Sequence, residues 1–549
     1  MLKKENKYIY NSTIRSVFNK IYKKYPDNIF LASESCSFNN ISREYSFKDV
    51  KKHIKNNIFF FKKCELSTGD RIAVVVGNNP EYFILKLSLN YFGLSCIPIN
   101  NELSAKEIYF IIKNADPKYI IFSLNNKKLI KNAITVKEKL TVGFISFNSN
   151  KLSLVKKNIN RKKKIIKNFN SKLESSILYT SGTTGEPKGC ILTNEYEINA
   201  GYSYAKKKGL ISFKLGKERL FNCLPVHHVN SGVLSLFAML MTANCQIQAE
   251  RFSVKNFWKE INSSKATIFH YLGVMVPLLL KTKKSFYEKN TILRLGVGAG
   301  IEPDLHQSFE ERFKVTMIEL WGMTEMVRCI FDYKKNRKIG KRCFGKISYG
   351  LESKVVDTKG NEIINSEGLL LIRFNKKNPK TGFFTEYNKN KLATKKVWKN
   401  NWFNTGDIVK KDEKGYHYFV DRAKNIIRRS GENISSAEVE QSLLRLNYIR
   451  NCAVIQKKHD IYEEEVFAFI VTMKEVKENL SLGKRILKDL KTDLAYFKLP
   501  CYIKFIKTLP ITSSQKTNRG KLKEKVLSYK KNEYLNLENY KRSLKNIFN

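Results

Sequence analysis

The sequence predicts an α/β protein with a large N-terminal domain of layered sheets and helices and a small C-terminal α+β domain. At 549 residues the chain is too long for a single domain. In the N-terminal part, the β-branched run Ile72–Val76 is followed by the turn residues Gly77–Pro80 and then by a helical pattern from Tyr82. This strand, turn and helix order recurs along the chain, which favours buried parallel strands between helices.

Further strand-like runs follow in the N-terminal part, each beside Gly or polar turn residues. They are Tyr119–Phe122, Ala266–His270 and Leu293–Val297. The apolar-leaning segment Val315–Leu320 ends directly before Trp321, as the end of a strand would. We therefore expect layered sheets over most of the first 420 residues.

A change near residue 420 predicts a domain boundary, with domains 1–420 and 421–549. The strand-like Tyr416–Val420 ends in a charged segment, and Ser435 with Ser436 then opens a helix. The strand-like Val466–Val471 and one more helix complete the C-terminal part. A stretch of this size can form a small α+β unit.

The net charge of +50 is the most unusual bulk property of the chain. Lysines are spread from Lys3 to Lys545 together with many Asn and Ile residues, which indicates codon drift in an AT-rich genome. The strongest run, Arg161–Lys164, sits in Asn-rich sequence and is typical of a solvated loop. A nucleic-acid-binding protein is an alternative, but it predicts clustered charge with interleaved aromatic residues.

The ten cysteines form no C-x-x-C pair and show no metal-ligand spacing with His, so we expect reduced thiols. The N-terminus lacks the apolar core of a signal peptide, and no stretch of about 18 apolar residues occurs. These features predict a cytoplasmic protein without an integral membrane segment.

The segment Tyr179–Gly189 (YTSGTTGEPKG) is the densest chemical signal in the sequence. Its three glycines allow a ligand to approach the backbone, and its four hydroxyls and free N–H groups can surround an anion. Lys188 adds a positive charge. The glycine spacing and Pro187 depart from the Walker pattern. A polar surface turn is the alternative interpretation.

This segment closely resembles the phosphate loop of the acyl-adenylate-forming superfamily, which includes acyl-CoA synthetases, peptide-synthetase adenylation domains and firefly-type luciferases. The resemblance continues in chain order and covers nearly the whole chain. The further matching segments are Gly69–Arg71, Asn79–Glu81, Leu224–His228 (LPVHH), Trp321–Glu325 (WGMTE), Trp402–Asp407 (WFNTGD), Asp421–Lys424 (DRAK), Gly431–Asn433 (GEN) and Leu509–Lys516 (LPITSSQK).

The resemblance implies a nucleotide-binding site. Trp321 would line the adenine site, Thr324 would bond the α-phosphate and Glu325 would hold Mg²⁺. Because Mg²⁺ prefers hard oxygen ligands and shares them with phosphates, one carboxylate can suffice. A solvated acid or helix cap is the alternative for Glu325. The full set of implied nucleotide-binding residues is Thr180, Ser181, Gly182, Thr183, Thr184, Lys188, Gly298, Ala299, Gly300, Trp321, Gly322, Asp407 and Arg422.

Asp407 follows a turn, and by resemblance its carboxylate accepts hydrogen bonds from both ribose hydroxyls. A turn-capping Asp is the alternative. Arg422 resembles the family's ribose or phosphate contact. His228 resembles the histidine between the nucleotide and acyl sites, although a packed structural His is commoner in general.

Lys516 is implied as the catalytic lysine that bridges the attacking carboxylate and the α-phosphate, where negative charge is concentrated. Gln515 stands where the family usually has Gly, which departs from its pattern. Lys424 is the implied hinge of a mobile C-terminal domain, and Gly431 centres the loop that faces the thiol of coenzyme A. Rotation about such a hinge lets one site serve two half-reactions.

The resemblance therefore predicts an ATP-dependent acid–CoA ligase that uses Mg²⁺ and takes a carboxylic acid, ATP and coenzyme A, with no nucleic-acid partner. The alternative is a stand-alone adenylation enzyme that loads a carrier-protein thiol. Because the sequence ends soon after Lys516, we expect no fused carrier domain. The acid stays open between carnitine-type, short, medium and long-chain substrates, and a homodimer stays open as well.

Overall fold

The computed structural model describes residues 11–34, 42–136, 142–148, 150–157, 169–180, 187–347, 350–429, 432–491, 493–512 and 516–545. The chain divides into two units. The first comprises residues 1–352 and 373–403, and the second comprises residues 353–372 and 404–549. The boundary predicted at residue 420 stays a prediction.

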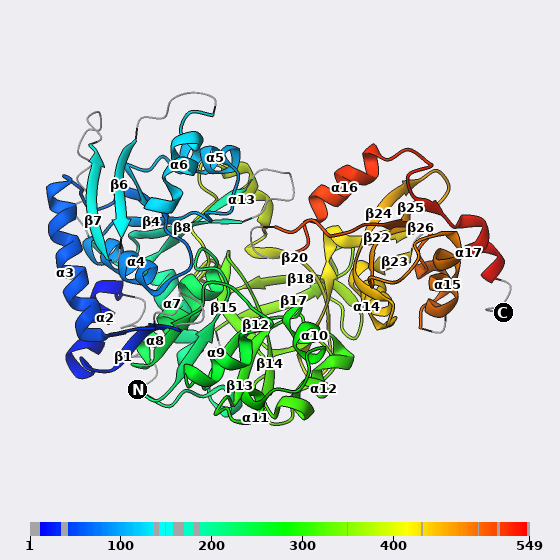
Figure 1. The fold of residues 1–549 in the computed structure, drawn as a ribbon, viewed down its shortest axis with the longest axis horizontal. Coiled ribbons are helices and arrows are strands. Elements are labelled where there is room, and N and C mark those ends of the chain that lie inside the picture. Colours follow the sequence, from blue (N-terminus) through cyan, green and yellow to red (C-terminus); the bar gives the residue numbers. More distant parts are fainter. Residues whose placement is uncertain are drawn as a thin grey trace. The chain divides into compact units, whose positions relative to one another are not determined.

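A seven-stranded sheet forms one layer of the first unit (Figure 1). Its order is β7-β6-β5-β3-β4-β8-β9, with parallel inner strands and antiparallel edges. The inner strands are almost continuously apolar because both of their faces are covered. The strands are β3 (Arg71–Val75), β4 (Ser95–Pro98), β5 (Tyr119–Ser123), β6 (Gly143–Asn148), β7 (Lys151–Lys156), β8 (Glu174–Thr180) and β9 (Lys188–Thr193).

An eight-stranded sheet forms a second layer of the same unit, in the order β15-β14-β13-β12-β10-β11-β1-β2. Its edge strands β15 and β2 are antiparallel and its inner strands are parallel. The strands are β1 (Ile29–Ser33), β2 (Arg43–Ser46), β10 (Arg219–Asn222), β11 (Cys245–Gln248), β12 (Ile268–Leu272), β13 (Leu295–Ala299), β14 (Thr316–Met323) and β15 (Met326–Phe331).

Helices α4 (Pro80–Phe92) and α7 (Asn194–Ala205) contact strands of both sheets and form a middle layer. Asn79 caps α4, Pro80 opens it, and Gly93 ends it with a φ of 97° that suits glycine. Residues 80–90 of this helix are all buried, because a sheet covers it on each side. The short helix α8 (Leu236–Met241) packs against α7.

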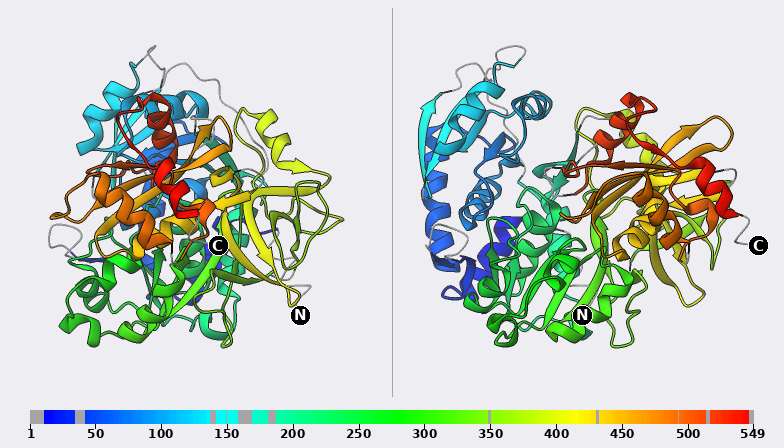
Figure 2. Two further views of the ribbon diagram at one scale, coloured as in Figure 1. Left: turned by 90° about the vertical axis from the view of Figure 1, so that its right-hand side faces the viewer. Right: turned by 45° about the vertical axis from the view of Figure 1, so that its right-hand side comes forward.

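Other helices cover the outer faces of the two sheets. The core of the seven-stranded sheet includes residues from α5 (Ala105–Ala115) and α6 (Lys127–Ala133), and that of the eight-stranded sheet includes α9 (Phe257–Ser263), α10 (Met275–Leu280) and α12 (Pro303–Phe313). Figure 2 shows the long helix α3 (Phe47–Lys63) at the edge of this unit. The unit also contains α2 (Ile14–Lys24), α11 (Phe286–Lys289), β16 (Cys343–Lys346), α13 (Lys391–Val397) and β19 (Trp398–Lys399).

The second unit begins with strands β17 (Glu352–Val356), β18 (Glu367–Arg373), β20 (Trp402–Lys411) and β21 (Tyr416–Arg422), which lie in the order β21-β20-β18-β17. Its second sheet has the order β23-β22-β25-β26-β27, and β24 pairs with β25. The strands of that sheet are β22 (Ile426–Arg429), β23 (Glu432–Ser435), β24 (Ile449–His459), β25 (Glu463–Thr472), β26 (Tyr502–Phe505) and β27 (Leu535–Asn536).

Among the described residues of the second unit, four α-helices pack with their apolar faces in the core that they share with the strands. They are α14 (Ser436–Arg445), α15 (Leu480–Leu490), α16 (Arg519–Ser528) and α17 (Glu538–Lys545). Ser435 caps α14 by accepting from the N–H of Glu438, as the sequence predicts. The predicted α/β fold with a smaller α+β C-terminal part is confirmed.

Within the described ranges, no helix is both long and apolar enough to span a bilayer. Nine cysteines in those ranges are buried and free, in agreement with the prediction of reduced thiols.

Candidate active site

Glu325 lies in the turn between β14 and β15, and its side chain is buried. The hydroxyl of Tyr387 donates to its Oε1 over 2.6 Å. The segment that carries Tyr387 is held beside this turn, since the N–H of Phe384 donates to the carbonyl of Glu325. Tyr387 therefore fixes the direction in which the Glu325 carboxylate points.

Lys188 approaches the same tyrosine from β9, with its Nζ 5.3 Å from the ring centroid of Tyr387. The backbone pairs there too, because Cys190 forms a bridge with Tyr387 and the N–H of Asn388 donates to Gly189. The structure thus brings Lys188 and Glu325 to two sides of one phenol. A cation and a carboxylate that lie beside the same phenol can bind a polyphosphate and its metal ion.

Thr180 ends β8 opposite Lys188, and its hydroxyl donates to the carbonyl of Lys188 over 3.4 Å. The carbonyl of Thr324 accepts from the hydroxyl of Tyr196 over 2.6 Å. Burial raises the pKa of Tyr196 well above its usual value, so this phenol stays a donor. Thr180 is therefore tied to β9 and Thr324 to α7, which directly follows β9 in the chain.

The small residues Gly298 and Ala299 end β13, and Gly300 follows with a φ of 81°. A Cβ on Gly298 would come 2.2 Å from the carbonyl oxygen of Tyr271, so only glycine fits. On the neighbouring strand, Trp321 stacks on Phe344 with ring centroids 5.8 Å apart. A Cβ on Gly322 would lie 2.6 Å from Sγ of Cys329.

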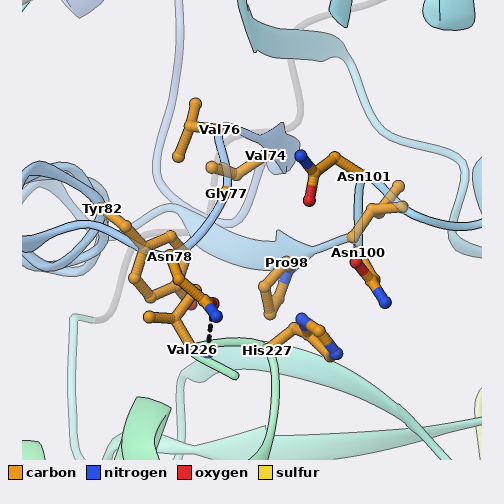
Figure 3. A pocket seen from close by; sticks show the side chains of 11 residues that line it. Val74, Val76, Gly77, Asn78, Tyr82, Pro98, Asn100, Asn101, Val226 and His227 are labelled. Atoms are coloured by element: carbon orange, nitrogen blue, oxygen red, sulfur yellow. Dashed lines mark hydrogen bonds between the residues drawn. The ribbon is translucent and has the colours of Figure 1, made fainter. Parts of the chain in front are cut away.

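A pocket lies where β3 and β4 end and the segment after β10 begins (Figure 3). The side chain of Asn78 accepts from the N–H of Val226 over 2.9 Å. In the part of the chain that is described, His227 Nε2 is buried and has no hydrogen-bond partner. Burial lowers the pKa of His227 to about 4, so the ring is neutral. The pocket is lined by Val74, Val76, Gly77, Asn78, Tyr82, Pro98, Ile99, Asn100, Asn101, Val226 and His227.

His228 follows this pocket in the chain. Its N–H donates to Pro225, and its carbonyl accepts from Gly232 at the start of a π-helix, Asn230–Ser235. Such wide turns occur often at functional sites. The geometry places His228 beside the pocket-lining His227, with ring centroids 4.7 Å apart.

In the second unit, Asp407 and Arg422 face one another across β20 and β21. Nε of Arg422 lies 2.7 Å from Oδ1 of the buried Asp407. Lys516 is exposed, yet desolvation by surrounding protein lowers its pKa; Arg422 lowers it further, and Asp407 opposes both. Burial likewise lowers the pKa of Lys424, followed by the effect of Arg422. These four predicted residues thus share one electrostatic environment.

Five predicted site residues fall outside the described ranges: Ser181, Gly182, Thr183, Thr184 and Gly431. The others divide between the two units, each of which is described by itself. Lys188, Glu325, Thr180 and Thr324 come together in the first unit, where Gly298–Gly300 and Trp321–Gly322 occupy neighbouring strand ends. Asp407, Arg422, Lys424 and Lys516 come together in the second.

Three residues were missed by sequence reasoning. Tyr387 and Tyr196 stand in no recognisable motif, and only the fold brings them to Glu325 and Thr324. Glu319 is a buried carboxylate on β14 that accepts from the N–H groups of Gly300 and Ile301. A single acid inside the apolar run Met317–Leu320 was the signal that could have identified it.

Across the described residues, no group of three or more His, Cys, Asp or Glu side chains could hold a metal ion. Glu325 offers one hard oxygen donor group beside a cation, which fits Mg²⁺ bound jointly with phosphates and does not fit a metal held by protein alone.

Comparison with known proteins gives matches over nearly the whole chain. The model of the AMP-binding enzyme family matches residues 18–376, and that of the AMP-binding enzyme C-terminal domain matches residues 438–516. A crotonobetaine/carnitine–CoA ligase from Escherichia coli O17:K52:H18 (strain UMN026 / ExPEC) is 26% identical over 526 residues, which cover 93% of this chain and 98% of the relative.

Two solved structures share the fold. ATP-bound MatB from Rhodopseudomonas palustris has a TM-score of 0.78 at 20% identity, covering 94% of this chain and 99% of that one. The o-succinylbenzoate CoA synthetase MenE from Bacillus subtilis, in complex with the acyl-adenylate intermediate OSB-AMP, has a TM-score of 0.76 at 20% identity, covering 93% and 98%.

Proposed function

Because the chain belongs to the AMP-binding enzyme family, we propose that it is an ATP-dependent acid–CoA ligase that forms an acyl adenylate and then an acyl-CoA. The single observation that carries this proposal is the convergence of Lys188 and Glu325 on Tyr387. The three residues come from chain segments far apart in sequence, and Lys188 and Glu325 each stand in a motif of the family. Their charges suit the two components of a metal–nucleotide complex.

In the first half-reaction, a carboxylate oxygen of the acid attacks the α-phosphorus of ATP and pyrophosphate leaves. Lys188 and the Thr180 segment would hold the outer phosphates. Lys516 would lie between the carboxylate and the α-phosphate, where a cation offsets the repulsion of two anions. Asp407 would accept from the ribose hydroxyls and fix the sugar.

Glu325 would hold Mg²⁺ together with phosphate oxygens, and Tyr387 would orient the carboxylate by its hydrogen bond. When bound, Mg²⁺ supplies charge neutralisation at the phosphates. Thr324, whose carbonyl is fixed by Tyr196, would present its hydroxyl or N–H to the α-phosphate.

In the second half-reaction, the sulfur of coenzyme A attacks the acyl carbon, AMP leaves, and the thiol proton passes to solvent or base. Lys424 would be the hinge, and Gly431 would face the pantetheine arm. The 3₁₀ turn Ala423–Asn425 that contains Lys424 joins β21 to β22, so few backbone dihedrals need to change.

The relatives act on different acids, so similarity to them does not identify the acid substrate. The Escherichia coli relative acts, by its name, on crotonobetaine and carnitine, and the Bacillus subtilis enzyme on o-succinylbenzoate. The near-complete coverage of the CoA ligase supports free coenzyme A as acceptor over a carrier-protein thiol. The buried free cysteines support a cytoplasmic site of action.

The test is a panel of carboxylic acids assayed for pyrophosphate release with and without coenzyme A. It should include carnitine-type, aromatic, short, medium and long-chain acids. We expect one class to release pyrophosphate in a single burst without coenzyme A and continuously with it. Release that stays a single burst with coenzyme A, but turns over with a carrier protein, would support the alternative acceptor. If no acid causes pyrophosphate release, the proposed function is wrong.

A further inference from the structure

Glu319 is a buried carboxylate in the first unit that binds the backbone of the glycine segment Gly298–Ile301. It pairs with Gly298 in the parallel register of β13 and β14. Its Oε1 accepts from the N–H of Ile301 over 2.9 Å, and its Oε2 accepts from the N–H of Gly300 over 3.2 Å. Both oxygens of one carboxylate therefore hold two consecutive amides.

Three of the four residues of the glycine segment, Gly298, Ala299 and Gly300, have a small side chain or none. Gly300 adopts a φ of 81°, and a Cβ on Gly273 would come 1.6 Å from the Gly300 carbonyl oxygen. The N–H of Gly273 donates to Ala299 over 2.9 Å. Ile301 packs in the core of the eight-stranded sheet, but Gly298, Ala299 and Gly300 offer little side-chain packing, so their position depends mainly on hydrogen bonds.

We propose that Glu319 is a positioning residue that fixes Gly298–Ile301 in the conformation that accepts the nucleotide. This inference rests on the proposed function, because the segment is assigned to the adenine side of the site. Glu319 touches no substrate and acts through the backbone of its neighbours. The deprotonated form is the better partner for two amides, since a carboxylate only accepts, whereas the protonated acid carries one O–H donor and has less acceptor capacity.

Glu319 changes its charge state near neutral pH. Burial raises its pKa to about 7, while the N–H groups of Ile301 and Gly300, then His306 and Arg342, oppose that rise. From β12, Tyr271 also faces it, and its hydroxyl donates to the carbonyl of Ile318. His306 on α12 is paired with Glu310 at 3.4 Å, and Arg342 with Glu302 at 2.8 Å.

The pKa sets the direction in which these hydrogen bonds change with pH. Above about pH 7 the carboxylate is ionised and both amides are held, and below it protonation releases one of them. Glu319→Gln imitates the protonated form, because its amide keeps one acceptor and adds a donor. Wild type at low pH and the variant at any pH should therefore behave alike.

The experiment measures ATP binding by calorimetry without acid or coenzyme A, on both sides of pH 7. The ratio of the dissociation constants of Glu319→Gln and wild type cancels the titration of ATP itself. We expect a ratio of about five or more at high pH, falling toward one at low pH. Hydrogen exchange should show faster exchange of the Gly300 and Ile301 amides in the variant, with other amides of β13 and β14 unchanged.

Asp332→Asn is the matched control. Asp332 is also buried and accepts a backbone N–H, from Lys338 over 2.7 Å, but it does not bind the glycine segment. It should change neither the ATP ratio nor exchange at Gly300. If Glu319→Gln does not fold, exchange of the Gly300 and Ile301 amides in wild type, relative to other β13 amides, still has to rise as pH falls through 7.

A ratio of dissociation constants near one at every pH overturns the inference, and so does unchanged hydrogen exchange at the Gly300 and Ile301 amides. In either case, ATP binding by the wild type would still support the proposed function. Wild type that binds no ATP overturns the proposed function and the inference with it. A ratio that is raised equally at all pH values contradicts the titration of Glu319 and also overturns the inference.

Discussion

Asp407 and Arg422 are paired neighbours on β20 and β21, with Nε of Arg422 2.7 Å from Oδ1 of Asp407. The carboxylate is buried, whereas the guanidinium is partly exposed. A carboxylate that is paired with one cation still has lone pairs for other donors. This pair is therefore prepared to accept hydroxyl groups from a nucleotide.

Asp407→Asn should weaken ATP binding by about 10- to 100-fold, because hydrogen bonds to a charged group contribute about 1.5–3 kcal/mol. Calorimetry with ATP and 2′-deoxy-ATP measures the effect. Wild type should lose affinity for the deoxynucleotide, and the variant should lose little more. Glu413→Gln, in the exposed turn between the same strands, is the control. Equal sensitivity of wild type and Asp407→Asn to the missing hydroxyl would exclude the ribose contact.

Lys516→Ala should reduce acyl-AMP formation by about 100-fold or more, since removal of a preorganised donor at developing charge costs that much. Thioester formation from supplied acyl-AMP should stay nearly intact. The two half-reactions are followed separately as pyrophosphate release and acyl-CoA formation. Lys525→Ala on α16 should change neither. Equal loss of both halves would contradict a role confined to adenylation.

The alkaline limb of the adenylation rate should report the protonation of Lys516. Desolvation by surrounding protein and then Arg422 lower its pKa from 10.5, and Asp407 raises it. Because the protonated form bridges the anions, the rate at saturating ATP should fall as pH rises, at a lower pH than for a free lysine. Arg422→Gln should move this limb to higher pH and Asp407→Asn to lower pH. If neither substitution moves the alkaline limb, the limb reports the titration of a group other than Lys516.

Tyr387→Phe should raise the Mg²⁺ concentration needed for half-maximal pyrophosphate release by about tenfold or more, because outer hydrogen bonds typically contribute 10- to 100-fold in metal affinity. The hydroxyl that donates to Glu325 over 2.6 Å would be lost, while the ring would remain beside Lys188. Glu325→Gln should have a larger effect, and Tyr333→Phe none. A changed maximal rate with an unchanged Mg²⁺ requirement would contradict metal binding at Glu325.

Much of the architecture could be predicted from local pattern. Strand-like runs such as Ile72–Val76 and Tyr119–Phe122 coincide with β3 and β5, and Ser435 caps α14. Apolar runs, turn residues and caps are encoded within a few neighbouring residues. The sheet order, in which β12 pairs with β10 and β8 with β4, depends on long-range contacts that local pattern does not specify.

The candidate site also contains residues that the sequence could identify and residues that it could not. Glu325 and Lys188 could be selected because each stands in a recognisable motif, but their shared partner Tyr387 could not. Tyr387 is more than 60 residues from Glu325 in the chain, and long-range backbone contacts such as the bridge between Cys190 and Tyr387 bring it to the site. Glu319 was overlooked because a buried acid in a strand is informative only once its amide partners are known.

The buried ion pair between α4 and α7 gives a prediction about stability. Nζ of Lys86 lies 2.8 Å from Oε2 of Glu197, and both side chains are fully buried in the middle layer. Ser175 also donates to Glu197, over 2.9 Å. Removal of one partner from such a pair leaves an uncompensated charge, so Lys86→Met should lower the unfolding free energy of the first unit by about 3–5 kcal/mol.

The double variant Lys86→Met, Glu197→Gln should recover at least about 2 kcal/mol of that loss, because it removes the stranded charge and keeps an acceptor for Ser175. Lys157→Met, which breaks an exposed pair with Glu65, should cost less than about 1 kcal/mol. Urea unfolding followed by tryptophan fluorescence reports mainly on this unit, since Trp258, Trp321 and Trp398 lie in it and Trp402 is its residue at the start of β20, a strand that continues into the second unit. A double variant no more stable than Lys86→Met would mean that lost packing of the lysine, and not the buried charge of Glu197, causes the destabilisation.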